Sequence, residues 1–130
     1  MLKIGMFHEV TFPVTGELTA RAVGSGTLEV LATPVMIAGM EKAAWTAVAG
    51  ALPEGSSTVG TRMEVSHSSA TPVGMTVTCR AELLEAEGRR LVFRVTASDE
   101  AGPIGEGTHE RFLVQDERFL KKAREKRRPN

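Results

Sequence analysis

The sequence has 130 residues, of which 42% are hydrophobic and 25% charged, and its 16 basic and 16 acidic side chains give a formal net charge of zero. This length and composition predict one compact globular domain. Nucleic acid is not expected as the main partner, because binding to the phosphate backbone requires a surplus of basic residues.

We expect neither export nor insertion into a membrane. The N-terminal segment MLKIGMFHEVTF has no long apolar stretch and no small-residue cleavage site, so it does not resemble a signal peptide. No apolar run is long enough to cross a bilayer. The single cysteine, Cys79, cannot form an intrachain disulfide, and no Cys/His cluster has the spacing of zinc ligands. We therefore expect a cytoplasmic protein with no metal and no cofactor.

The first predicted elements are a strand and a long helix. Residues 6–14 alternate roughly between apolar and polar side chains and predict an opening strand, and the glycine-containing residues 15–31 predict a flexible connection with little helix. The run ATPVMIAGMEKAAWTAVAGALPEG then predicts a helix that has Thr33 as its N-cap, Pro34 at its first helical position and Gly50 near its end. The residues expected to share its apolar face are Met36, Met40, Ala43, Ala44, Ala47 and Val48.

Four further segments have the pattern of strands: STVGTRMEVSH, MTVTCRAELLEAE, RLVFRVTAS and IGEGTHERFLV. Short turns such as EGRR and DEAGP join the later ones, which predicts an antiparallel meander. In the second and third segments the residues expected on one face are Val77, Cys79, Ala81 and Leu83, and Leu91, Phe93, Val95 and Ala97.

One antiparallel sheet and one apolar helix predict an α+β hotdog fold, in which a sheet of about five strands wraps around one long central helix. We expect residues 1–115 to form this single domain. Residues 116–130, DERFLKKAREKRRPN, are expected to form a charged tail that contains a short helix.

Three residues are candidates for chemistry, and each also has a purely structural interpretation. Glu41 lies on or beside the apolar face of the helix, as either a glutamate that reaches solvent or a buried or half-buried carboxylate that could serve as a base or nucleophile. Thr33 is either a simple cap or a hydroxyl beside the free amides of the helix start. His67 is either a polar residue at the end of a strand or a general acid/base.

Three stretches, VLATPVMIAGMEKAA, VGTRMEVSHSSATPVGMTVT and AELLEAEGRRLVFRVTASDEAGPIGEGTHER, resemble in order and interval the fluoroacetyl-CoA thioesterase family of hotdog enzymes. The resemblance covers about residues 30–111. It implies hydrolysis of the thioester of a short acyl-CoA, with Thr33, Glu41 and His67 as the catalytic residues. It further implies that Gly60 and Arg111 bind the substrate.

One segment departs from the family's pattern. The fluoroacetyl-specific enzyme carries phenylalanines before the helix that close over the fluorinated acyl group, whereas TARAVGSGTLEVLA has no aromatic residue. We therefore expect a small or medium acyl-CoA as substrate rather than selectivity for fluoroacetyl-CoA. The alternative is a non-catalytic hotdog protein that binds acyl-CoA or a related ligand, and a hotdog dehydratase ranks lower.

The residues leave two mechanisms open. Glu41, or a water that it activates, attacks the carbonyl while His67 transfers protons, or Thr33 attacks with Glu41 and His67 as its activators. Thr33 and Glu41 are eight positions apart, about 12 Å along one helix, so we do not expect them to touch within one chain. We therefore predict a homodimer or a dimer of dimers with the active site at the subunit interface, as in hotdog relatives.

Overall fold

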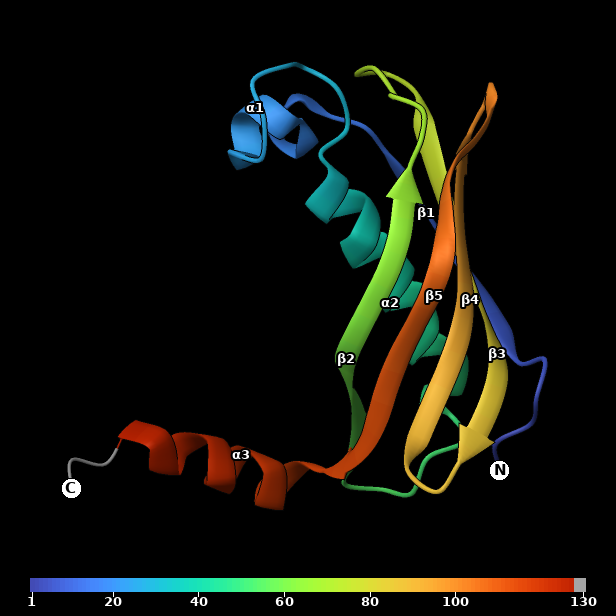
Figure 1. Cartoon of the computed structure of the whole chain (residues 1–130), viewed down its shortest axis with the longest axis vertical. Coiled ribbons are helices and arrows are strands. Elements are labelled where there is room, and N and C mark those ends of the chain that lie inside the picture. Colours follow the sequence, from blue (N-terminus) through green and yellow to red (C-terminus); the bar gives the residue numbers. More distant parts are fainter. Residues whose placement is uncertain (128–130) are drawn as a thin grey trace.

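The computed structural model describes residues 1–127. Its elements are β1 (Phe7–Pro13), η1 (Gly16–Leu18), α1 (Ala20–Val23), α2 (Thr33–Ala49), β2 (Ser56–His67), β3 (Thr76–Glu87), β4 (Arg90–Asp99), β5 (Gly102–Gln115), α3 (Asp116–Arg124) and η2 (Glu125–Arg127). The strands form one five-stranded sheet in the order β1-β3-β4-β5-β2, and α2 lies across one face of this sheet (Figure 1).

Every strand pair in the sheet is antiparallel. Strands β3, β4 and β5 follow one another as a meander, because the connections between them are too short for a crossover. The strands β1 and β2, which flank the long helix in the sequence, lie at the two opposite edges. This arrangement confirms the predicted α+β hotdog fold.

The core lies between α2 and the inner face of the sheet. All eight residues predicted to face inward from β3 and β4 are buried, and so is the apolar face of α2 except for Ala47, which is half-buried. Gly39 allows the helix to approach β3 closely, because a Cβ added there would lie 2.7 Å from Sγ of Cys79. Burial raises the pKa of Cys79 to about 12, so this thiol is an inert part of the core.

The start of α2 differs from the prediction. The N-cap is Ala32 rather than Thr33, and Thr33 is the first helical residue, with Pro34 after it. The carbonyl of the fully buried Ala32 accepts hydrogen bonds from the amides of Val35 and Met36, which fixes the first turn without a side-chain cap. The hydroxyl of Thr33 is therefore not engaged in capping.

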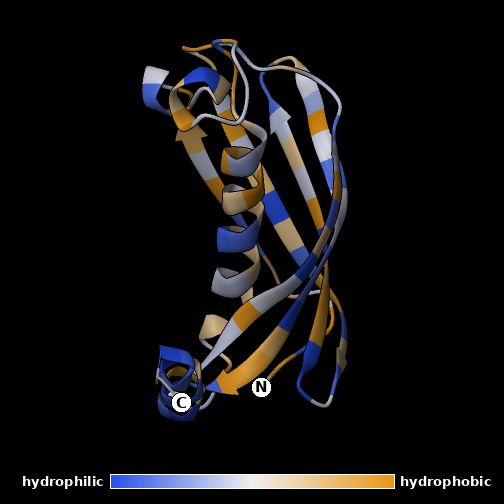
Figure 2. Cartoon of the chain, turned by 60° about the vertical axis from the view of Figure 1, so that its left-hand side comes forward, coloured by the Kyte–Doolittle hydropathy of each residue, from blue (hydrophilic) through white to orange (hydrophobic). Residues whose placement is uncertain are grey.

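The tail leaves the sheet at the end of β5. Helix α3 extends away from the sheet and beyond the edge formed by β2, and it has no buried residue (Figures 1 and 2). Residues 128–130 of the expected tail lie outside the described residues. Over residues 1–127, no helix is both long and apolar enough to cross a membrane.

Candidate active site

Thr33 and His67 meet at one end of the molecule. Thr33 begins α2, and His67 is the last residue of the edge strand β2, which brings the imidazole to the start of the helix. Oγ1 of Thr33 lies 2.7 Å from Nδ1 of His67. The threonine is exposed and the histidine is half-buried, so a substrate can reach the hydroxyl.

The environment of His67 favours the neutral imidazole. Burial lowers the pKa of His67, and a hydrogen bond with the backbone of Ser69 offsets this only in part. One ring nitrogen of a neutral histidine is an acceptor. In the tautomer whose acceptor is Nδ1, the Thr33 hydroxyl donates to it, which is the arrangement of a nucleophile and its base.

A second polar cluster surrounds Glu41 on the next turns of α2. Oε2 of Glu41 lies 3.5 Å from Nη1 of Arg111 and 3.9 Å from Nε2 of His109. The Arg111 guanidinium is held by Thr58, whose Oγ1 and main-chain oxygen each accept a hydrogen bond of 2.8 Å. The Arg111 side chain is only 7% exposed, whereas that of Glu41 is 42% exposed. The carboxylate is thus fixed on one side and open on the other.

His109 supports this cluster from within the sheet. Its Nδ1 lies 2.8 Å from the main-chain oxygen of Arg62, which can only accept, so Nδ1 carries the proton. Nε2 is then free to accept from Nη1 of Arg111 at 3.1 Å. Burial lowers the pKa of His109 and the charge of Arg111 lowers it further, against the opposing effects of the Arg62 carbonyl and Glu41.

The predicted catalytic residues therefore fall into two groups within one chain. In the described residues, hydrogen bonds and ion pairs join Thr33 to His67 and Glu41 to Arg111, and none joins Glu41 to either member of the first pair. His109, which contacts Arg111 from the same strand, was not predicted as a site residue. Thr58 was missed, because nothing in the local sequence marks it as the partner of Arg111.

Gly60 lies directly against the second cluster, beside a break in the β2–β5 register between Gly60 and Arg62. A Cβ added at Gly60 would lie 2.7 Å from Oε2 of Glu41, 3.2 Å from Cε1 of His109 and 3.4 Å from Nη1 of Arg111. Local bulges of this kind are common next to active sites. The absence of a side chain at Gly60 is what leaves room for the carboxylate.

Gly60→Ala is expected to displace the Glu41 carboxylate and lower kcat/KM by about 10- to 100-fold, because small misplacements of a reacting group are costly. Gly50→Ala is the matched control, since nothing lies within 4 Å of a Cβ at that position. Thioester hydrolysis and thermal unfolding would be measured for both variants. Unchanged kinetics in Gly60→Ala would show that the position of Glu41 does not matter.

Comparison with known proteins places this chain in a family. The sequence model of the family described as fluoroacetyl-CoA-specific thioesterase matches residues 14–117. The chain is 48% identical over 98 residues to the fluoroacetyl-CoA thioesterase of Streptantibioticus cattleyicolor, covering 75% of this chain and 70% of that protein. A solved structure of a fluoroacetyl-CoA thioesterase superimposes with a TM-score of 0.92 at 38% identity, covering 99% of each chain.

A more distant relative is a thioesterase superfamily member from Thermus thermophilus. It superimposes with a TM-score of 0.87 at 29% identity, covering 97% of this chain and 96% of the other. The family match over residues 14–117 and the 48% identity to a fluoroacetyl-CoA thioesterase both exceed what a shared fold alone would produce. This chain belongs to the fluoroacetyl-CoA-specific thioesterase family of hotdog proteins and is a thioester hydrolase.

Proposed function

We propose that this protein hydrolyses a small or medium acyl-CoA to the free acid and CoA. The observation that carries the proposal is the 2.7 Å contact between the exposed Thr33 hydroxyl and the imidazole of His67, which burial keeps neutral. A hydroxyl and a base at this distance form the reacting pair of covalent acyl transfer. A non-catalytic acyl-CoA-binding protein would not require this pair.

In the proposed reaction, the Thr33 oxygen attacks the thioester carbonyl carbon and His67 takes the hydroxyl proton. The tetrahedral intermediate collapses with cleavage of the carbon–sulfur bond, and the departing CoA thiolate receives that proton. Water then attacks the acyl ester of Thr33, loses a proton to His67, and releases the acid as Thr33 is reprotonated. The N-terminus of α2, where Thr33 lies, is a favourable place for the developing oxyanion.

Glu41 completes this site from a second subunit in our proposal. Its separation from Thr33 and His67 within one chain, together with its open side, leaves it free to act across an interface. Glu41 would orient the attacking water, with Arg111 and Gly60 fixing the carboxylate and the acyl group. This shared active site can form in a homodimer or in a dimer of two such dimers.

The edge strand β2 is the surface that we assign to this interface. It pairs with β5 on one side only, and its twelve residues present a long unpaired edge of the kind that binds another strand. Antiparallel pairing of two β2 strands about their midpoint would set Ser56 opposite His67 of the partner subunit. Because paired strands lie about 4.8 Å apart, this would bring the Thr33–His67 pair of the partner subunit to the end of β2 at which Thr58 holds Arg111 of the Glu41 cluster.

A second candidate is selectivity for fluoroacetyl-CoA. It is favoured by the activity in the name of the 48% identical relative. The observation against this selectivity is that residues 19–32, the segment before α2, contain no aromatic residue. Cytoplasmic location remains part of the main proposal, since a single unpaired buried cysteine suits a reducing compartment.

The decisive experiment is release of free thiol from a panel that contains acetyl-, fluoroacetyl-, butyryl-, hexanoyl- and phenylacetyl-CoA. We expect hydrolysis of at least one non-fluorinated ester with a kcat/KM in the range of about 10⁴–10⁸ M⁻¹s⁻¹ that is common for enzymes. A kcat/KM for fluoroacetyl-CoA that exceeds every other by about 100-fold or more would establish selectivity for fluoroacetyl-CoA instead. That ratio corresponds to a difference of about 2.7 kcal/mol in activation free energy. Tight binding of esters without turnover would support the non-catalytic alternative.

A further inference from the structure

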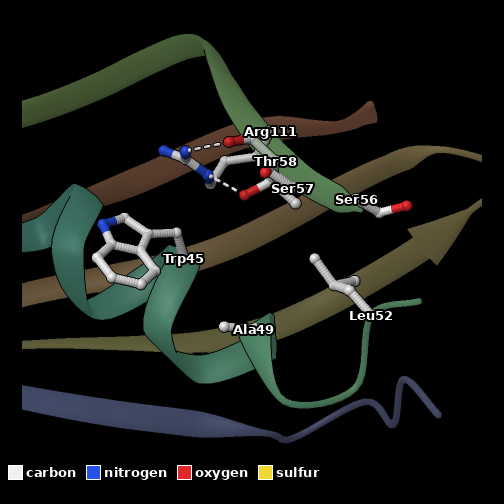
Figure 3. A pocket seen from close by; sticks show the side chains of 7 residues that line it. All are labelled: Trp45, Ala49, Leu52, Ser56, Ser57, Thr58 and Arg111. Atoms are coloured by element: carbon white, nitrogen blue, oxygen red, sulfur yellow. Dashed lines mark hydrogen bonds between the residues drawn. The ribbon is translucent and has the colours of Figure 1, made fainter. Parts of the chain in front are cut away.

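A cavity of about 420 Å³ lies between the C-terminal half of α2 and the start of β2 (Figure 3). Trp45, Ala49 and Leu52 line the side that belongs to α2 and the connection after it. Ser57 and Thr58 line the side that belongs to β2. The cavity therefore has one apolar wall and one wall of small hydroxyl side chains.

The cavity adjoins the Glu41 cluster through Arg111, whose guanidinium also lines it. The same guanidinium lies 3.5 Å from Oε2 of Glu41, so that this end of the cavity is close to the carboxylate. The inference rests on the proposed function. If the thioester carbonyl reacts between Glu41 and the Thr33–His67 pair, the acyl group is directed into this space.

Trp45 is the largest apolar side chain that lines the cavity. This residue is 46% exposed, although it lies on a helix whose other large apolar residues face the core. An indole left open beside a hollow provides a flat wall on which an aromatic ring can stack with a favourable offset geometry. Leu52 and Ala49 extend this wall beyond the ring.

The size of the cavity exceeds what a two-carbon acyl group requires. At about 30 Å³ for each water-sized group, a cavity of about 420 Å³ has room for on the order of ten such groups. Pockets that bind small organic ligands typically measure about 300–1,000 Å³. An acetyl or fluoroacetyl group would leave most of the space, including the indole wall, without contact.

The charges at the inner end argue against an acyl group that ends in a carboxylate. Arg111 is the cation there, but Glu41 is within 3.5 Å of it and His109 and Thr58 accept hydrogen bonds from it. A second carboxylate would meet the charge of Glu41 as well as that of Arg111. The wall chemistry therefore favours a neutral acyl group.

We propose that this cavity is the acyl-binding subsite, and that it selects a bulky, uncharged acyl group whose aromatic ring stacks on Trp45. Straight medium-length chains would bind less well than an aromatic acyl group of similar size, because they cannot stack on the indole. Two-carbon acyl groups would bind least well, because they contact little of the apolar wall.

Trp45 is the single tryptophan of the chain, so intrinsic fluorescence reports directly on the cavity. The emission of the His67→Ala variant would be titrated with phenylacetyl-, hexanoyl-, acetyl- and fluoroacetyl-CoA, using free CoA to correct for absorption by the nucleotide. We expect phenylacetyl-CoA to change the Trp45 emission with a Kd at least about tenfold lower than that of acetyl-CoA. Hexanoyl-CoA is expected to lie between the two.

Ala49→Phe fills the cavity from an exposed helical position and should leave the core intact. In the otherwise wild-type enzyme we expect it to lower kcat/KM for phenylacetyl-CoA by about tenfold or more, and for acetyl-CoA by less than about twofold. Ala38→Phe is the matched control, since Ala38 is exposed on the same helix and lies outside this cavity.

Equal Kd values for phenylacetyl- and acetyl-CoA, or a preference for fluoroacetyl-CoA, would overturn the assignment of the subsite. So would an Ala49→Phe variant that affects all esters alike. These outcomes differ from failure of the proposed function, which would appear as no hydrolysis of any ester by the wild-type protein. The fluorescence titration does not depend on turnover and decides the subsite in either case.

Discussion

His67→Ala is expected to lower kcat for the best acyl-CoA substrate by about 10²- to 10⁴-fold, the usual contribution of a general base. The reason is the 2.7 Å contact, since removal of the imidazole leaves the Thr33 hydroxyl without a proton acceptor. Thiol release under saturating substrate would measure the loss. His8→Ala is the matched control, because His8 is exposed in β1, on the far edge of the sheet.

The pH profile separates a base from a merely structural histidine. Burial lowers the pKa of His67, so the neutral, active form persists to a lower pH than for an ordinary histidine. In the wild-type protein kcat/KM should fall only as the pH drops through this lowered pKa, and the residual activity of His67→Ala should lack that acidic limb. A variant that keeps the limb, or one whose only change is a lower thermal stability, would remove His67 from the chemistry.

The mass of the protein after brief exposure to substrate identifies the attacking oxygen. If Thr33 attacks, brief exposure to substrate should produce a protein whose mass is raised by one acyl group, and Thr33→Ala should not form it. Thr33→Ser keeps the hydroxyl and should retain the adduct. Full activity of Thr33→Ala together with loss in His67→Ala would instead indicate direct attack by water.

Periodicity was enough to predict the fold because the hydrophobic pattern is regular. The alternating apolar residues of β3 and β4 and the apolar face of α2 all lie in the core. This agrees with the prediction because hydrophobic periodicity marks the one face of each element that is buried. The N-cap was misplaced by one residue because the cap is the buried Ala32, whose carbonyl rather than its side chain fixes the first turn. Side-chain preferences carry no signal for such a cap.

The site was only partly predictable, because its contacts are not local in the sequence. The Thr33–His67 contact joins residues 34 positions apart, and that of Arg111 with Thr58 joins residues 53 apart. Both depend on β2 lying beside β5 at the edge of the sheet, an order that periodicity does not specify. The spacing on one helix was enough to predict that Thr33 and Glu41 lie apart, but the pairing of Thr33 with His67 and of Glu41 with Arg111 was seen only in the structure.

Because the site is divided in this way, we expect two inactive variants to complement each other in a mixed dimer. Glu41→Gln and His67→Ala should each be nearly inactive as homodimers. If the site combines Glu41 of one subunit with the Thr33–His67 pair of the other, a mixed dimer contains one intact site and one doubly altered site. Random exchange of equal amounts makes half of the dimers mixed, so activity should recover to about a quarter of the wild-type value.

The converse mixture provides the control. Wild-type chains mixed with the double variant Glu41→Gln/His67→Ala form mixed dimers in which each site has lost one half, so activity should fall to about a quarter rather than remain at about half. Subunits would be exchanged by co-expression with two tags, and thiol release measured on the unseparated mixture. The doubly purified mixed dimer should keep about half of the wild-type rate for the two single variants and almost none for wild type with the double variant. A site contained within one chain predicts the opposite of both results, because the mixed dimer of single variants stays inactive and the wild-type chain keeps its full rate beside the double variant. The Thr33–His67 pair lies at one end of α2, and the carboxylate bound by Arg111 lies eight residues further along the helix. If both groups act on the same thioester, the mixed dimer of the two single variants must be active.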